Sequence, residues 1–205
     1  VNSGTNTIYT GEGTNTVTLT GGNSTVNAGT GADTITASDA LGKRNIVLGD
    51  HGKLLFSKSE KNSHLLATIE TTKSGVDESA TASDDTINLA SGNAIVVGGA
   101  GKDNITISAA ASNEATNRLV VGGHAKLEFD ALGSLIKLRT TDSTVTQDSD
   151  DRVTIGAARN AASGSFGSNI VVTGMGNDTI LIGGGSDLLD AISGRGISRD
   201  IVIAD

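Results

Sequence analysis

A nine-residue repeat at the start of the chain constrains the fold more than any other feature of the sequence. Residues 2–37 divide into four consecutive nonapeptides with Gly at the third position and a β-branched residue at the seventh. These positions hold Gly4, Gly13, Gly22 and Gly31, and Ile8, Val17, Val26 and Ile35. So short a period predicts a solenoid, in which each repeat stacks on its neighbours.

The same nonapeptide frame returns further along the chain. Residues 81–107 and 165–191 each contain three more nonapeptides, and residues 147–155 contain another. The fifth position in these repeats is frequently Asp, as at Asp85, Asp103, Asp151, Asp178 and Asp187. Residues 156–164 have the right length but fit the pattern poorly. They are expected to form a degenerate coil or a surface insertion.

A longer period overlies the short one. Residues 45–56 align with residues 118–129, and residues 200–205 resemble the start of a third copy. Strand-like stretches follow at residues 65–72 and 135–141. We therefore expect one continuous solenoid array over residues 1–205, and we interpret the chain as a fragment of a longer one. The expected long units are residues 1–44, 45–117 and 118–200, approximately, with a further unit starting at 201–205.

Each nonapeptide has a turn half and a strand half. Glycines permit the positive φ angles of tight turns, and the following Thr-Ile or Asn-Ile segment favours a half-buried strand. One coil buries only one or two aliphatic side chains, worth about 1.5–3 kcal/mol each. That is less than the entropy cost of ordering nine residues, so stacked neighbours or a turn ligand must stabilise it. The predicted fold is all-β, a parallel β-helix solenoid with inserted strand-turn-strand segments.

Composition excludes several classes of protein. The net charge of −8 repels phosphate backbones, so no nucleic-acid partner is expected. No apolar run approaches the roughly 18 residues that a transmembrane segment needs. The chain has no Cys, which excludes disulfides and thiolate metal sites. Aromatic residues make up only 2% of the chain, too few to anchor one thick globular core.

The Gly-x-Gly-x-Asp-x-Ile nonapeptides resemble the RTX, haemolysin-type calcium-binding repeats of secreted bacterial proteins. The longer units are similar to repeats of very large bacterial surface or adhesin-like proteins. The resemblance implies a parallel β-roll in which turns two nonapeptides apart share Ca²⁺, held by Asp carboxylates and turn carbonyls, ligands that suit this ion. The metal-site residues implied by the resemblance are Asp33, Asp85, Asp103, Asp178 and Asp187, with Gly31, Gly101, Gly176 and Gly185 in the same turns.

Several fifth positions depart from the family pattern. They are occupied by Asn6, Asn15, Ser24, Ala94 and Asn169. Asp85 and Asp103 give a carboxylate at both ends of a step of two nonapeptides, whereas the Asn15–Asp33 and Asn169–Asp187 steps give only one each. The first array is therefore expected to be metal-free or weakly binding, with Asn and Thr ladders along the solenoid. For the pairs Asp85/Asp103 and Asp178/Asp187, the alternative role is a turn residue that bonds its own backbone.

Nothing in the sequence predicts catalysis. The chain lacks the motifs of zinc proteases, serine hydrolases and P-loop proteins. The acidic pairs Asp84-Asp85 and Asp150-Asp151 recur at one phase of the repeat, whereas a catalytic pair would be expected only once. His51 and His124 also recur, at equivalent points of the long repeat, and are expected to mark solvent-exposed turns. We expect the protein not to be an enzyme.

These observations favour a structural, non-catalytic, extracellular segment of a large bacterial surface, adhesin or matrix protein. Ca²⁺ is the cofactor expected to make this segment rigid. Its expected partners are Ca²⁺ and either neighbouring copies of itself or components of the cell surface or matrix. One alternative is the calcium-folding secretion domain of an exported toxin, lipase or protease. Another is a subunit of a self-assembling extracellular filament or sheath. The long repeat favours the scaffold, because the nonapeptides of a secretion domain usually run unbroken.

Overall fold

The computed structural model describes residues 4–38, 43–57, 65–71, 83–90, 92–109, 116–141, 150–156, 168–173, 178–182 and 199–203. Within these residues the chain forms three β-sheets and no helix. The predicted all-β solenoid with inserted hairpins is therefore confirmed. In the same described part, no helix is long and apolar enough to cross a membrane.

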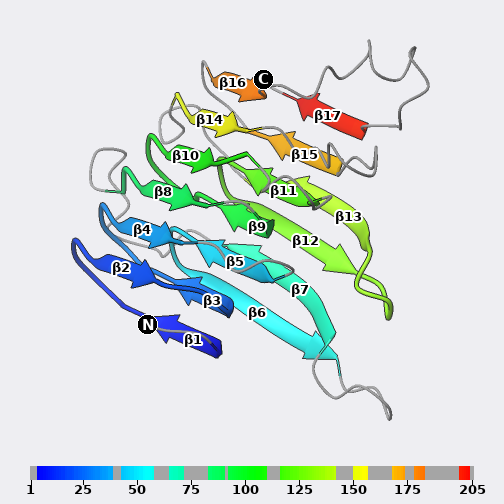
Figure 1. Ribbon diagram of the computed structural model, residues 1–205, viewed down its shortest axis with the longest axis horizontal. Coiled ribbons are helices and arrows are strands. Elements are labelled where there is room, and N and C mark those ends of the chain that lie inside the picture. Colours follow the sequence, from blue (N-terminus) through cyan, green and yellow to red (C-terminus); the bar gives the residue numbers. More distant parts are fainter. Residues whose placement is uncertain are drawn as a thin grey trace.

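Two parallel sheets form the solenoid, and the chain alternates between them as it winds along the axis (Figure 1). Sheet A pairs, in spatial order, β1 (Thr5–Tyr9), β3 (Asn23–Asn27), β5 (Arg44–Leu48), β9 (Asn93–Val97), β11 (Arg118–Val121), β15 (Ser168–Val172) and β17 (Arg199–Ile203). Sheet B pairs β2 (Thr16–Leu19), β4 (Thr34–Ala37), β8 (Thr86–Leu89), β10 (Asn104–Ile107), β14 (Arg152–Ile155) and β16 (Thr179–Ile182). One coil therefore consists of two nonapeptides, one for each sheet.

Rows of aliphatic side chains fill the space between sheets A and B. In the nonapeptides that the structure describes, the seventh residue points inward, as the alternation predicts, so that Val26, Ile35 and Ile105 are fully buried. Because the strands pair in register, Ile35 lies beside Ile87, which lies beside Ile105. Each coil thus extends the apolar row of the coil before it, which is how a thin solenoid reaches a continuous core.

A third sheet, sheet C, covers the outer face of sheet A. It is antiparallel and has the order β13 (Leu135–Thr140), β12 (Ala125–Phe129), β7 (Leu65–Thr71) and β6 (Gly52–Ser57). Its inward residues, among them Ile69 and Leu127, pack on Ile95 and Val97 of sheet A. Strands β9 and β11 are therefore buried on both faces, which explains why they read as continuous apolar runs rather than alternating ones.

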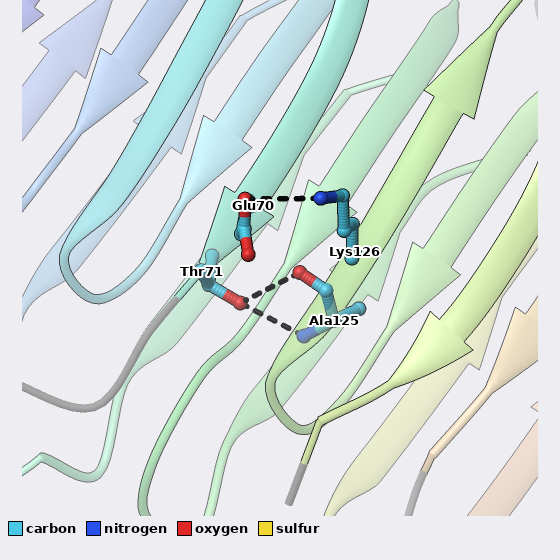
Figure 2. A network of polar contacts seen from close by, with 4 residues as sticks. All are labelled: Glu70, Thr71, Ala125 and Lys126. Atoms are coloured by element: carbon cyan, nitrogen blue, oxygen red, sulfur yellow. Dashed lines mark hydrogen bonds and ion pairs between the residues drawn. The ribbon is translucent and has the colours of Figure 1, made fainter.

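The hairpins β6–β7 and β12–β13 belong to successive long repeats, and they join through β7 and β12 (Figure 1). At the joint, the hydroxyl of Thr71 accepts a hydrogen bond from the Ala125 amide at 2.9 Å and donates one to the Ala125 carbonyl at 3.3 Å (Figure 2). Glu70 and Lys126 form an ion pair at 3.4 Å on the outer face. These contacts make sheet C continuous along the solenoid.

Phe56 of β6 is 50% exposed, and the register of β6 on β7 shifts between Leu55 and Phe56. One local expectation was wrong. His124 is only 5% exposed and does not lie in a solvent-exposed turn. Its carbonyl accepts a hydrogen bond from the Thr141 amide, so the β12–β13 hairpin closes over this turn.

Candidate metal-binding side

The solenoid has two edges that carry different residues. The chain crosses from sheet A to sheet B along one edge, which we call the aspartate side, and crosses back along the other, which we call the return side. On the aspartate side, the residue immediately before each strand of sheet B is acidic in every described coil except the first, where it is Asn15. In axial order these residues are Asn15, Asp33, Asp85, Asp103, Asp151 and Asp178.

One carboxylate oxygen of each aspartate binds the backbone of the preceding coil. The Asp33 amide donates to Oδ1 of Asp85 at 2.8 Å, and the Asp85 amide donates to Oδ1 of Asp103 at 2.9 Å. The same bond joins Asn15 to Asp33 at 2.6 Å, Asp103 to Asp151 at 2.9 Å and Asp151 to Asp178 at 2.8 Å. The aspartates therefore bond the preceding coil rather than their own turn, in contrast to the ordinary role of Asp in turns.

The second carboxylate oxygen points into the interior of the turn. Oδ2 of Asp33, Asp85 and Asp103 is buried and has no hydrogen-bond partner among the described residues, and Oδ2 of Asp178 is in the same state. The first three side chains are each 1% exposed. A buried carboxylate oxygen without a donor is costly, so these positions call for a counter-charge.

Glycines of sheet A strand ends make room for these oxygens. A Cβ added to Gly98 would collide with both Oδ2 of Asp103 and the carbonyl oxygen of Gly122. A Cβ added to Gly49 would collide in the same way with Oδ2 of Asp85 and the carbonyl oxygen of Gly98. Carboxylate and carbonyl oxygens therefore converge on one glycine in successive coils, and only a residue without a side chain fits there.

Burial and mutual repulsion disfavour the charged form of these aspartates. The pKa of Asp85 is raised to about 8, and burial is the largest cause. A hydrogen bond from the Asp33 backbone lowers this pKa, whereas the charges of Asp33 and Asp84 raise it further. Burial raises the pKa of Asp103 well above its ordinary value, and the charges of Asp151, Asp85 and Asp50 raise it further. Burial also raises the pKa of Asp33, although hydrogen bonds from Asn15 lower it.

The profile of the RTX calcium-binding nonapeptide repeat matches the chain in four copies, over residues 18–39, 79–106 and 155–189. The nonapeptides in these segments are similar to RTX repeats. No curated protein and no solved structure matches it significantly. The matched segments contain Asp33, Asp85 and Asp103, three of the buried aspartates described above.

The oxygen atoms of the aspartate side fit the calcium that RTX repeats bind. Ca²⁺ takes hard oxygen ligands from carboxylates and backbone carbonyls in flexible geometry. In the described part of the chain, no three His, Cys, Asp or Glu side chains gather closely enough to hold an ion by themselves. Carbonyl oxygens, such as those of Gly98 and Gly122, would therefore complete the ligand set of Asp85 and Asp103. Bound calcium would supply the positive charge that the buried Oδ2 atoms lack.

The structure brings together the predicted site residues that it describes. Asp33, Asp85, Asp103 and Asp178 lie in one column, and Asp85 and Asp103 are adjacent, as their spacing of two nonapeptides predicts. Gly31 and Gly101 lie two residues before Asp33 and Asp103, with φ angles of 117° and 103° that favour glycine. Asp187, Gly176 and Gly185 lie outside the described residues. That these residues ligate calcium stays a prediction.

Sequence reasoning left two acidic residues out of the candidate site. Asp151 has the right phase in the repeat, but its coil has only one recognisable nonapeptide and lies outside the matched segments. Asp50 belongs to the long repeat, and its Oδ2 accepts a hydrogen bond from the Ala100 amide at 2.5 Å. It is fully buried and its charge raises the pKa of Asp103, which places it near the column. The phase of the repeat was a signal for Asp151 but not for Asp50.

The expected Asn ladder is found only in part. Asn6 donates to the Ser24 hydroxyl of the next coil at 3.3 Å, as a ladder requires. The side-chain amide of Asn15 instead donates to the Gly13 carbonyl of its own turn at 2.8 Å. Asn93 and Asn117 on the return side also link coils, since their Oδ1 atoms accept hydrogen bonds from the amides of Asn117 and Ser168. Polar ladders therefore concentrate on the return side.

Proposed function

We propose that this chain is a structural, non-catalytic, extracellular segment of a large bacterial surface, adhesin or matrix protein, and that Ca²⁺ stiffens it along the aspartate side. The observation that carries the proposal is the column of buried aspartates whose Oδ2 atoms face glycine and carbonyl oxygen. RTX repeats belong to calcium-binding regions of secreted bacterial proteins, which supports an extracellular location. Millimolar extracellular calcium suits modules of modest affinity.

The residues of the column link coils in two ways. Oδ1 of each aspartate holds the amide of the preceding coil, as between Asp85 and Asp103. Oδ2 remains to bind the ion, so that one side chain joins the backbone of one coil to the metal. Loss of the metal leaves like charges such as Asp103 and Asp151 facing each other, which raises the free energy of the folded coils. Calcium thus acts on the stacking of coils and on no chemical reaction.

Two features support a scaffold over the calcium-folding secretion domain of an exported enzyme or toxin. The nonapeptide coils are interrupted by the hairpins β6–β7 and β12–β13, which recur at equivalent points of the long repeat. These hairpins pair with each other through β7 and β12, so the interruption adds a second layer along the axis. Strands β1 and β17 lie at opposite ends of sheet A, and the rod lengthens with every added coil.

Thermal unfolding followed by circular dichroism tests the calcium part of this proposal. We compare the chain in EDTA, in 10 mM Mg²⁺ and in 10 mM Ca²⁺. Sites with a dissociation constant of about 10⁻⁴ to 10⁻³ M would each add roughly 1–3 kcal/mol in 10 mM calcium. We expect a higher melting temperature in Ca²⁺ than in either other condition. An equal melting temperature in all three contradicts calcium as a folding element.

Single-molecule force measurement tests the mechanical part. The chain is held at its two termini and pulled in Ca²⁺ and then in EDTA. If calcium links coils, the unfolding force falls in EDTA and recovers when Ca²⁺ returns. The Asp84→Asn variant serves as a control, because Asp84 is exposed and its neighbour Asp85 remains in the column. An unfolding force that is the same in Ca²⁺ and in EDTA contradicts a stiffening role for calcium.

A further inference from the structure

The return side contains a buried cation at a position equivalent to the aspartate column. The fifth residues of the sheet A nonapeptides pair in register as Asn6, Ser24, Asn45, Ala94, Arg118 and Asn169. None of these is acidic, and the next register position is Asp200. Arg118 is 1% exposed and is among the largest fully buried side chains of the described residues. A charged side chain in the interior of a thin solenoid requires a physical reason.

The guanidinium of Arg118 reaches carbonyl oxygens in three return-side turns. One terminal nitrogen donates to Gly156 at 2.6 Å, the other donates to Ser108 at 3.0 Å, and Nε donates to Gly92 at 3.5 Å. These carbonyls follow β14, β10 and β8, so a single side chain spans three successive coils. The fork of a guanidinium offers donors in several directions and no acceptor, so it matches a set of carbonyl oxygens.

The residue one coil earlier leaves space for this side chain. Ala94 is the register partner of Arg118 in β9 and has only a methyl group at the position where Arg118 carries its guanidinium stem. Turn carbonyls are the same type of ligand that the aspartate side presents at Gly98 and Gly122. On the return side, these oxygens face a cation that is part of the chain.

We propose that Arg118 is a built-in cation that takes the place of a metal ion on the return side, so that calcium dependence is confined to the aspartate side. This inference rests on the proposed function, because it divides the two edges by their need for Ca²⁺. Removing the guanidinium would take a charged donor away from the carbonyls of Gly92, Ser108 and Gly156, of which the Gly92 residue is buried, and hydrogen bonds from a charged donor are stronger than those between neutral groups.

Residue-resolved hydrogen exchange of the full chain, in EDTA and in 10 mM Ca²⁺, tests the division. The reporters on the return side are the amides of Ala94, Ser108 and Gly156, which donate to neighbouring coils. Those on the aspartate side are the amides of Asp85 and Asp103. We expect EDTA to accelerate exchange at least tenfold on the aspartate side and less than twofold on the return side. Equal acceleration on both sides overturns the proposal.

Substitutions of Arg118 separate a cation from a space-filling side chain. Arg118→Met keeps the length and removes the charge, whereas Arg118→Lys keeps the charge and loses the fork. We expect return-side protection in the order Arg, Lys, Met, with at least a tenfold loss in Arg118→Met in EDTA. Protection in Arg118→Met that equals the wild type overturns the proposal. If Arg118→Met does not fold, the comparison of Arg118→Lys with wild type decides, since equal return-side protection in both contradicts a need for the fork.

Arg118→Asp tests whether the space that the Arg118 guanidinium fills can hold a metal ion. It places a carboxylate at the register position where the aspartate side has one. We expect this variant to bind one more Ca²⁺ than the wild type in equilibrium dialysis, and to recover return-side protection only in calcium. An unchanged number of bound ions overturns the proposal. A wild type in which calcium protects neither edge contradicts the proposed function instead, and the order of the Arg118 variants in EDTA then decides the role of the cation.

Discussion

The aspartate side and the return side have the same nonapeptide frame, yet they differ in which groups balance the oxygen atoms of their turns. On the aspartate side, Asp85 and Asp103 add carboxylates to the carbonyls, and burial together with the charges of neighbouring aspartates raises the pKa of both side chains. On the return side, Arg118 and the side chains of Asn93 and Asn117 satisfy carbonyls and backbone amides from within the chain. If both proposals hold, the residue type at the fifth position of the repeat decides whether an edge of the solenoid depends on calcium.

The largest effect is expected where the aspartate side has no space. Gly98→Ala puts a methyl group against Oδ2 of Asp103 and the carbonyl of Gly122. Overpacking of this kind costs about 1–3 kcal/mol, and the collision also displaces two of the oxygens proposed to bind calcium. Chemical denaturation in EDTA and in Ca²⁺ measures both the loss of stability and the loss of the calcium response.

Gly133→Ala is the matched control. Gly133 has a positive φ of 81°, but a Cβ there meets nothing within 4 Å. Its replacement is expected to cost about 1–2 kcal/mol through backbone strain alone and to leave the calcium response intact. If Gly98→Ala behaves like Gly133→Ala, the glycine does not define the space for Oδ2.

A second variant is expected to have effects of opposite sign with and without calcium. Asp103→Asn retains an Oδ1 acceptor for the Asp85 amide and removes one buried charge. In EDTA the variant should be more stable than wild type at any pH high enough to ionise Asp103, because the repulsion from Asp151 and Asp85 is then absent in the variant. In 10 mM Ca²⁺ it should gain about 1–3 kcal/mol less than wild type from the ion. Melting curves of both proteins in EDTA and in Ca²⁺ measure this change of sign in the stability difference.

Asp84→Asn is the control for the charge itself. Asp84 is exposed and its Oδ1 accepts a hydrogen bond from the Lys102 amide at 2.8 Å. The substitution changes the net charge as much as Asp103→Asn does, at a position beside the column rather than in it. A calcium response reduced equally in both variants would assign the effect to general electrostatics.

The pH dependence should also differ between the metal-free and the loaded protein. The pKa of Asp85 is about 8 in the folded chain against an ordinary value of 3.8. The folded state therefore binds more protons than the unfolded state between these values, so the metal-free protein loses stability as pH rises from about 4 to 8. In saturating Ca²⁺ this loss should vanish, and calcium binding at pH 6 should release protons. Melting temperatures across this range and proton release on titration measure the effect, and stability in EDTA that rises with pH contradicts it.

The smallest effect is expected for the polar ladder on the return side. Asn117 is exposed, and its Oδ1 accepts a hydrogen bond from the Ser168 amide at 3.0 Å. Asn117→Ala removes one such bond at the surface, which costs about 0.5–1.5 kcal/mol. The cost should be the same in EDTA and in Ca²⁺, as denaturation in both conditions can show. A cost that differs between EDTA and Ca²⁺ would mean that the return-side ladder is energetically coupled to the aspartate side.

Periodicity was sufficient to predict the solenoid because every coil repeats the same local pattern. Gly31 and Asp33 before the strand residue Ile35 specify turn, coil-to-coil bond and core row within one short segment. The step between Asp85 and Asp103 likewise follows from two nonapeptides per coil. These features depend on residues that are close together in the sequence, so a repeat pattern reveals them directly.

Features that depend on contacts between distant segments were not predictable in the same way. Asp33 and Asp85 are far apart in the sequence, and only the folding out of the β6–β7 hairpin makes them neighbours. The burial of Arg118 follows from carbonyls of three different coils, none of which has an unusual sequence. His124 is buried for the same kind of reason, because a hairpin closes over its turn.

The return of the chain to its register after each hairpin has a consequence for how such a molecule can change. Asp85 binds Asp33 just as Asp103 binds Asp85, although the β6–β7 excursion separates the first pair. Closing a longer excursion costs little, about 0.6 kcal/mol for each doubling of its length. The turns between coils can therefore accept insertions independently of one another. New sequence can enter a turn and alter what the surface displays while the coils keep their pitch, so diversification and mechanical integrity need not compete in this architecture.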